Sequence, residues 1–208
     1  MIAVVDYGAG NLRNVCKALE HVGARPELTS DAQIIKQADK VVLPGVGAFA
    51  DCRQGLISAG LFTLLQDVAH SGTPFLGICV GMQLLFDVGH EMGEWSGLGL
   101  IPGHVVRFDF KHLDDGAKQL KVPHIGWNMI EPRKAHRLLT NVQKDGYAYF
   151  VHSFHPVADN VDDVVTTTSY GYDFASIVAR ENVWGIQFHP EKSQEVGLQI
   201  LRNFVEVA

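Results

Sequence analysis

Apolar and polar positions in the first half of the chain follow two alternating patterns, short continuous apolar runs and longer amphipathic runs. Runs that are typical of buried strands cover residues 2–5, 41–43 and 75–78. Apolar positions at helical spacing follow each of them, over residues 12–22, 49–69 and 82–88, with a break near Gly60. Strands that alternate with helices favour βαβ units, so we expect a parallel sheet with helices on both faces.

The second half of the chain shows a different pattern, with short apolar runs in quick succession. Strands are predicted over residues 105–108, 127–130, 147–151, 164–169, 175–179 and 184–188. This spacing is typical of antiparallel hairpins, and a last amphipathic helix is predicted over residues 194–205. We therefore predict one α/β domain over residues 1–208, with a mixed, mostly parallel central sheet and attached antiparallel hairpins.

Composition and charge narrow the classes of function. Of the 208 residues, 47% are apolar and 19% are charged, which provides enough apolar surface for a sizeable core. The formal net charge of -6 comes without a basic stripe, so we expect no nucleic-acid partner. No apolar run approaches the roughly 18 residues of a membrane helix, so we expect no membrane association.

The cysteines indicate a compartment and exclude some kinds of site. Cys16, Cys52 and Cys79 are too few for a disulfide framework and lack the paired spacing of a zinc site. A reducing environment fits such a set, and the N-terminal strand pattern lacks the basic region of a signal peptide. We therefore expect a cytoplasmic protein without a metal ion or other cofactor.

The candidate nucleophile lies in PFLGICVGMQLLF, residues 74–86, where a buried strand passes directly into an amphipathic run. Cys79 stands at this junction with Gly77 and Gly81 two residues to either side, which is the pattern of a nucleophile elbow. Such a turn would project the thiol beyond the strand ends, where the N–H of Val80 could stabilise an oxyanion. Taken alone, the pattern fits a buried, inert cysteine equally well.

A histidine and a carboxylate at another strand end favour the catalytic interpretation. In GIQFHPEKS, residues 185–193, His189 and Glu191 follow the strand predicted over 184–188. If this strand is parallel to the strand before Cys79, His189 reaches the same edge and can exchange a proton with the thiol. Glu191 could then bind the other ring nitrogen and fix the tautomer.

The turn after the strand at 41–43 supplies a second candidate oxyanion donor. In LPGVGAF, residues 43–49, glycines flank Val46, and the backbone N–H groups of Val46 and Gly47 could point toward an anion. Alone, an ordinary Pro-Gly turn would explain this pattern, so the donor role depends on the neighbouring elbow.

These motifs together resemble the class I, or triad, glutamine amidotransferases, which carry a cysteine elbow G-[IV]-C-x-G-x-Q and a His-Pro-Glu near the C-terminus. Here the two motifs are GICVGMQ (77–83) and HPE (189–191). Within that family, the glutaminase subunits of imidazole glycerol phosphate synthases are most similar on four further segments: DYGAGNLRNV (6–15), LPGVGAF (43–49), PHIGWN (123–128) and YFVHSFH (149–155). The resemblance covers essentially the whole chain and implies the flavodoxin-like fold of the family.

The resemblance implies an activity and a partner. The chain would hydrolyse glutamine to glutamate and ammonia through a thioester on Cys79, with His189 as acid and base and Glu191 as its orienting group. The ammonia would pass, without release to solvent, to a (β/α)₈ cyclase subunit of histidine biosynthesis within a heterodimer.

The resemblance also implies roles for residues outside the triad. Those expected to bind glutamine are Gln83, Glu91, Ser153 and Phe154, with Glu94 as the alternative to Glu91. Those expected at the cyclase interface are Asn11, Trp127, Asn128, Tyr149 and Lys192. Because Gly45 and Gly47 tolerate unusual φ angles, we expect the Val46 peptide to be turned away in the free chain and to reorient when the cyclase binds its ligand.

Two alternatives remain at this point. One is the glutaminase subunit of another class I amidotransferase, serving anthranilate, aminodeoxychorismate or pyridoxal phosphate synthesis; the segments DYGAGNL and GMQ argue against it. The other is a flavodoxin-like redox sensor whose Cys79 is oxidised, which would have no need of His189 and Glu191. The polar segment 111–119 is expected to lack a catalytic role.

Overall fold

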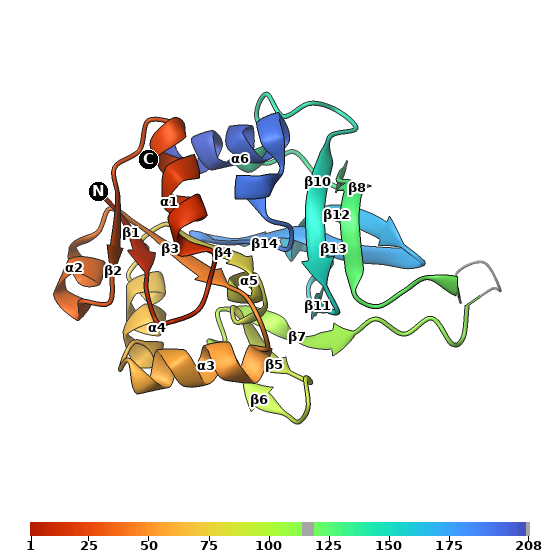
Figure 1. The fold of residues 1–208 in the computed structure, drawn as a ribbon, viewed down its shortest axis with the longest axis horizontal. Helices are drawn as coiled ribbons and strands as arrows, with labels where there is room; N and C mark the ends of the chain where they lie inside the picture. The colour runs from red at the N-terminus through yellow and green to blue at the C-terminus, as the bar shows by residue number, and fades with distance from the viewer. Residues whose placement is uncertain (114–118, 207–208) are drawn as a thin grey trace.

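A twisted central sheet separates two layers of helices in the computed structural model, which describes residues 1–113 and 119–206 (Figure 1). Within these residues the sheet has eight strands in the order β2-β1-β3-β4-β14-β13-β12-β9. The bounds of its strands are β1 Ile2–Val5, β2 Pro26–Thr29, β3 Lys40–Gly45, β4 Phe75–Cys79, β9 Glu131–Pro132, β12 Val164–Tyr170, β13 Tyr172–Arg180 and β14 Val183–Ile186.

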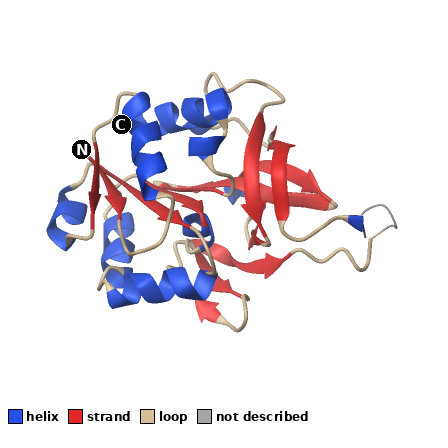
Figure 2. Cartoon of the chain, viewed as in Figure 1, coloured by secondary structure: helices blue, strands red, loops and turns tan. Residues whose placement is uncertain are grey.

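The helices cover both faces of this sheet, as the alternating pattern of the first half predicted. Helices α1 and α6 lie on one face, while α3, α4 and the short α5 lie on the other (Figures 1 and 2). The helix bounds are α1 Leu12–His21, α2 Ala32–Gln37, α3 Phe49–Ser58, α4 Phe62–His70, α5 Val80–Gln83 and α6 Gln194–Glu206, with short 3₁₀ turns η2 Arg137–Leu139, η3 Val161–Asp163 and η4 Pro190–Lys192.

The parallel part of the sheet decides which strand ends meet. Strands β1, β4 and β14 are apolar and buried along their whole length, as expected for strands covered on both faces. β4 is parallel to both of its neighbours, pairing Ile78 with Pro44 of β3 and with Ile186 of β14. The carboxyl ends of β3, β4 and β14 therefore lie side by side, which confirms the parallel pairing on which the position of His189 depends.

Two smaller sheets stand beside this edge. One pairs β8 with β10 antiparallel, and the other has the order β11-β7-β5-β6. Their bounds are β5 Phe86–Gly89, β6 Trp95–Ser96, β7 Ile101–Arg107, β8 His124–Met129, β10 Tyr147–His152 and β11 Phe154–Ala158. The junction between β10 and β11 lies across from the elbow, so the second half of the chain supplies one wall of the site.

The predicted mixed α/β architecture is confirmed, and one predicted helix is wrong. The helix expected over residues 82–88 ends at Gln83, and Phe86 to Gly89 forms β5, which pairs with β7. Leu84, Leu85 and Phe86 are all fully buried, so no exposed face distinguishes a helix from a strand in this run. The short elements β2, α2, β6, β9 and β11 were not predicted, and residues 114–118 of the polar segment lie outside the described residues.

Candidate active site

Cys79 occupies a strained turn between β4 and α5. Its backbone has φ 56° and ψ -113°, a positive φ that non-glycine residues rarely adopt. The residue is 3% exposed, and its side chain enters a pocket of about 300 Å³ beyond the strand ends. This is the geometry expected of a nucleophile elbow, so the structure supports that interpretation of the GICVG pattern.

The glycines around the elbow allow three backbone segments to meet without side chains between them. A Cβ added to Gly81 would lie 1.9 Å from the carbonyl oxygen of Leu43, and one on Gly77 would lie 2.5 Å from that of Gly81. A Cβ on Gly45 would lie 2.6 Å from Gly81 N. Since no real Cβ approaches a backbone atom this closely, only glycine permits β3, β4 and α5 to pack here.

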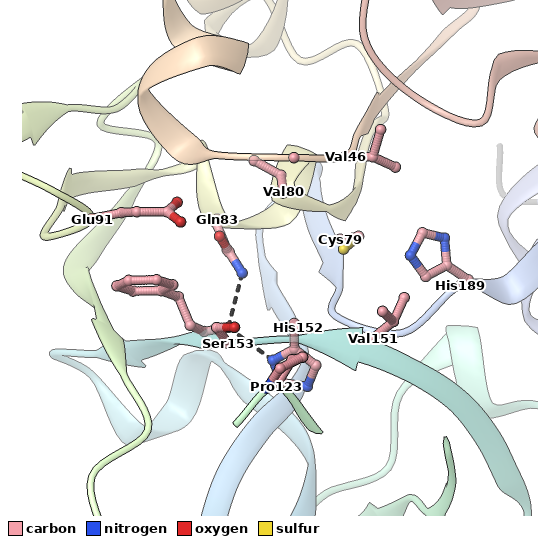
Figure 3. A pocket seen from close by; sticks show the side chains of 12 residues that line it. Val46, Cys79, Val80, Gln83, Glu91, Pro123, Val151, His152, Ser153 and His189 are labelled. Atoms are coloured by element: carbon pink, nitrogen blue, oxygen red, sulfur yellow. Dashed lines mark hydrogen bonds between the residues drawn. The ribbon is translucent and has the colours of Figure 1, made fainter. Parts of the chain in front are cut away.

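His189 reaches the same edge from β14, three residues after Ile186. Its ring lies beside the Cys79 side chain on the wall of the pocket (Figure 3). Its Nδ1 lies 2.9 Å from Glu191 Oε1, and both side chains are almost completely buried. The structure thus brings together Cys79, His189 and Glu191, the three predicted catalytic residues, although they come from two distant segments. These three residues are called the array below.

The charges of this array stabilise one another. Burial lowers the pKa of His189, but interactions with Cys79 and Glu191 outweigh it and raise the pKa to about 9. Burial raises the pKa of Glu191, whereas hydrogen bonds from His189 and Asn11 lower it more, so the net direction is downward. The arrangement therefore favours an imidazolium held between a carboxylate and the sulfur, which is suited to proton transfer at the thiol.

The residues expected to bind glutamine line the same pocket. Gln83, Glu91, Ser153 and Phe154 all contribute to its wall, together with the turn residues Val46, Gly47 and Val80 (Figure 3). Glu91 Oε2 accepts a 2.7 Å hydrogen bond from Phe49 N, which fixes the carboxylate at the pocket. Glu94 lies outside this wall, where its exposed side chain is 3.9 Å from His90 Nδ1. The structure therefore favours Glu91 over Glu94.

Gln187 is a buried polar residue beside the nucleophile that the sequence did not indicate. Its Nε2 lies 3.9 Å from Cys79 Sγ, and its Oε1 accepts from Gln83 Nε2 at 3.2 Å. Gln83 Nε2 also donates to the carbonyl of Phe154 at 2.9 Å. The available signal was the period of two in an extended segment, which puts the side chains of Gln187 and His189 on the same side.

Two side chains that the sequence did not single out hold the turn around Val46. The Tyr7 hydroxyl donates to Pro44 O at 2.7 Å, and the Cys52 thiol donates to Val46 O at 3.2 Å. Gly47 has φ +90°, so the next residue of the turn lies in the left-handed region. The turn is therefore fixed on both sides of the peptide that joins Gly45 to Val46.

The residues expected at a partner interface lie around the outer side of the array. Trp127 is 46% exposed and packs edge-on against Tyr149 with ring centroids 6.0 Å apart. Lys192 Nζ lies 5.7 Å from the centre of the Tyr149 ring. Asn11 touches the array directly, with its Nδ2 2.9 Å from Glu191 Oε1. Asn128 follows Trp127 on β8, but its side chain points to the opposite face and donates to Ser169 O.

The described part of the chain shows no metal site, membrane-spanning helix or disulfide. Residues 1–113 and 119–206 contain no group of three or more His, Cys, Asp or Glu side chains placed to hold a metal ion. The helices within the same residues are all too short or too polar to cross a membrane. All three cysteines are free thiols.

Comparisons with known proteins agree on one family. The family model described as "Glutamine amidotransferase class-I" matches residues 3–208. A protein of Salinibacter ruber named "Imidazole glycerol phosphate synthase subunit HisH" is 53% identical, with 98% of this chain and 93% of that protein covered. A protein of Geobacter metallireducens with the same name is 48% identical over 98% and 96% of the two chains.

Solved structures show the same fold at lower sequence identity. A "Crystal structure of glutamine amidotransferase" superposes with a TM-score of 0.74 at 17% identity, covering 99% of this chain and 98% of that one. The "Structure of PurLQS from Thermotoga maritima" gives a TM-score of 0.72 at 21% identity, covering 98% and 96%.

Proposed function

This chain belongs to the class-I glutamine amidotransferases, and from that premise we propose that its pocket hydrolyses glutamine at Cys79 and supplies ammonia to a cyclase subunit. The chain is the glutaminase subunit of an imidazole glycerol phosphate synthase, since it matches HisH proteins of that enzyme over nearly its whole length. The observation that carries the mechanism is the strained elbow at Cys79, with His189 beside it and Glu191 bound to the far ring nitrogen.

The first half-reaction forms a thioester. Cys79 Sγ, after giving its proton to His189, attacks the side-chain amide carbon of glutamine. The N–H groups of Val80 and Val46, in the turn completed by Gly47, hold the resulting oxyanion, and each donor lowers the barrier by about 3 kcal/mol. His189 then donates its proton to the amide nitrogen, the C–N bond breaks and ammonia leaves.

The second half-reaction restores the thiol. A water molecule attacks the thioester carbon while His189 takes its proton, and the collapse of the intermediate expels the sulfur. The proton on His189 returns to Cys79, and glutamate is released. Throughout, Glu191 keeps the His189 ring in one orientation, because its Oε1 holds Nδ1 at 2.9 Å.

The walls of the pocket suggest how the amino-acid end of glutamine is held. The Glu91 carboxylate is a suitable partner for the α-ammonium group, since it lies on the pocket wall and is fixed by Phe49 N. Gln83 lies opposite, with its amide nitrogen turned toward Phe154 O. Backbone groups of Ser153 and Phe154 complete the site for the α-carboxylate.

We assign one set of residues to a heterodimer interface with the cyclase: Asn11, Trp127, Asn128, Tyr149 and Lys192. The names of the relatives describe subunits of a synthase, which supports a second subunit. A docked cyclase would cover the outer side of the array and receive ammonia before it reaches solvent. Three free cysteines fit a reducing cytoplasm.

A glutaminase assay tests the proposal directly. The purified chain is assayed with and without its cyclase and the ligand of the cyclase, and Cys79 is labelled with a glutamine-analogue electrophile. We expect glutamate release that rises with the cyclase, and labelling that disappears in Cys79→Ser together with activity. Glutamate release by Cys79→Ser at the wild-type rate would refute the thioester mechanism.

A further inference from the structure

A buried pair of histidines outside the catalytic array links Asn128 on β8 to the wall of the pocket. His124 on β8 and His152 on β10 are cross-strand partners and are 3% and 6% exposed. His124 Nδ1 lies 3.3 Å from His152 Nε2. His152 Nδ1 lies 2.8 Å from the carbonyl oxygen of Phe154, in the segment that lines the pocket (Figure 3).

The partners of these rings determine where each proton lies. Phe154 O can only accept, so His152 Nδ1 must carry the hydrogen. In a neutral ring Nε2 of His152 is then bare and accepts, which requires the hydrogen of His124 to be on Nδ1. Nε2 of His124 is bare in turn and needs a donor, which Asn128 Nδ2 supplies at 3.3 Å.

The surroundings keep both rings neutral. Burial lowers the pKa of His152 to about 3 and that of His124 to about 4. His124 stacks between Tyr170 and Phe150, with ring centroids 4.0 and 5.0 Å away, so water has little access to it. A neutral pair has one N–H hydrogen on each ring, and these two hydrogens are the ones that His152 Nε2 and Phe154 O accept.

The first donor of the chain is also fixed in orientation. Asn128 Oδ1 accepts from Met129 N at 2.9 Å, while its Nδ2 donates to Ser169 O at 2.9 Å as well as to His124. These two backbone contacts exclude the flipped amide, because a flipped Asn128 would face Ser169 O with its own oxygen. The hydrogen bonds therefore run in one direction, from Asn128 through both histidines to Phe154 O.

The last acceptor belongs to the substrate pocket. Phe154 O accepts from His152 and, at 2.9 Å, from Gln83 Nε2. The second hydrogen of Gln83 Nε2 goes to Gln187, whose own amide lies 3.9 Å from Cys79 Sγ. The position of this one carbonyl thus sets the backbone at Ser153–Phe154 and the orientation of the Gln83 amide.

We propose that His124 and His152 are positioning residues for glutamine, forming a hydrogen-bond relay with fixed tautomers that runs from Asn128 to Phe154 O. The relay rests on the proposed function, since it acts on the glutamine pocket. It determines where the α-carboxylate site and Gln83 stand before the substrate arrives. The Asn128 side chain points toward His124 and β12, on the face of β8 opposite Trp127, so the far end of the relay is anchored at Ser169 O.

Steady-state kinetics of the complex with the cyclase test the relay. His152→Phe keeps the ring shape but removes the donor to Phe154 O, and we expect KM for glutamine to rise at least about tenfold with kcat changed less than about threefold. His152→Asn keeps an N–H near the position of Nδ1 and should restore most of the affinity. An unchanged KM in His152→Phe would overturn the proposal.

His155 offers a matched control. It is 4% exposed, belongs to the same aromatic cluster and bonds the Tyr172 hydroxyl at 2.9 Å, but it does not line the pocket. His155→Phe therefore removes an equally buried imidazole without touching the relay, and its KM should stay within about twofold of wild type. A rise in KM equal to that of His152→Phe would assign both effects to general loss of packing and overturn the proposal.

Nitrogen NMR of ¹⁵N-histidine-labelled wild-type protein tests the relay without any change of activity, with signals assigned by their loss in His124→Phe and His152→Asn. We expect both rings to be neutral at pH 7 with hydrogen on Nδ1. A hydrogen on Nε2 of His152 would overturn the relay. Absence of glutaminase activity in the wild-type complex would overturn both proposals, whereas normal activity with unaffected variants would overturn the relay alone.

Discussion

Asn11 Nδ2 donates a 2.9 Å hydrogen bond to Glu191 Oε1, although 180 residues separate the two in the chain. The same oxygen holds His189 Nδ1, while Glu191 Oε2 is buried and has no hydrogen-bond partner among the described residues. The loop before α1 therefore orients the carboxylate that orients the histidine. The family resemblance implies a role for Asn11 at the partner interface, and its hydrogen bond to Glu191 also gives it a role in orienting the catalytic carboxylate.

Replacing Asn11 should slow the chemistry more than it weakens substrate binding. Asn11→Leu removes the donor and leaves Glu191 with one partner fewer, so His189 is held less firmly. We expect kcat at saturating cyclase to fall about tenfold, equivalent to the loss of one hydrogen bond to a charged group, with little change in KM. Asn14→Leu is the control, since the Asn14 side chain donates to Asn11 Oδ1 and leaves the donor from Asn11 Nδ2 to Glu191 in place. Equal kcat values for the two variants would contradict this role.

The elbow should tolerate no side chain at Gly81. A Cβ there would lie 1.9 Å from Leu43 O, so β3 and α5 would have to separate. We expect Gly81→Ala to reduce the free energy of unfolding by roughly 3 kcal/mol, measured by urea denaturation. Gly72→Asn is the control, because Gly72 has φ +90° and open space around it, and asparagine tolerates positive φ. A stable Gly81→Ala protein with normal activity would rule out this packing argument.

Thermal stability should fall on the alkaline side because of His189. Its pKa of about 9 in the folded protein lies above the ordinary value of about 6.5. A raised pKa contributes stability that is complete below pH 6.5 and is lost as the pH rises through about 9. Between pH 7 and 9.5, the Tm of the wild type should drop by roughly 5 °C more than that of His189→Asn. Parallel Tm curves for the two proteins would show that the ring is not charged in the native state.

Stimulation by the cyclase should depend on the freedom of Gly47. The residue has φ +90°, which proline cannot adopt because its ring fixes φ near -65°. Gly47→Pro should lock the Val46 turn in another conformation and abolish the increase in glutaminase rate on adding cyclase and ligand. Gly47→Asn accommodates the positive φ and should retain most of the increase. Full stimulation of Gly47→Pro would exclude a reorientation of this turn.

Trp127 should contribute to partner binding and not to the chemistry. Its side chain is 46% exposed and packs on Tyr149, next to Lys192. Exposed tryptophans at the centre of interfaces commonly carry much of the binding energy, so Trp127→Ala should weaken the cyclase complex at least about tenfold by calorimetry. Val161→Ala, at a side chain 79% exposed and outside the proposed interface, should bind normally. An unchanged Kd for Trp127→Ala would remove Trp127 from the interface.

Local patterns in the sequence determined the backbone around the site and the positions of its catalytic residues. The alternation of strands and helices predicted a parallel sheet, and glycines two residues to either side of Cys79 predicted an elbow at a strand end. Both predictions succeed because the constraint is local: a sharp turn needs glycine where backbones meet, and the ends of parallel strands share one edge. The motif His-Pro-Glu likewise keeps His189 and Glu191 within reach of each other.

The tertiary structure alone decided the contacts that orient the catalytic and pocket side chains. The bond from Asn11 to Glu191, the relay through His124 and His152, and the place of Gln187 beside Cys79 all join segments far apart in sequence. The run after Gln83 forms a strand because β7 is available to pair with it, not because of its own spacing. Periodicity reports which face of an element is buried, whereas the partner that meets each buried polar group depends on how the elements pack.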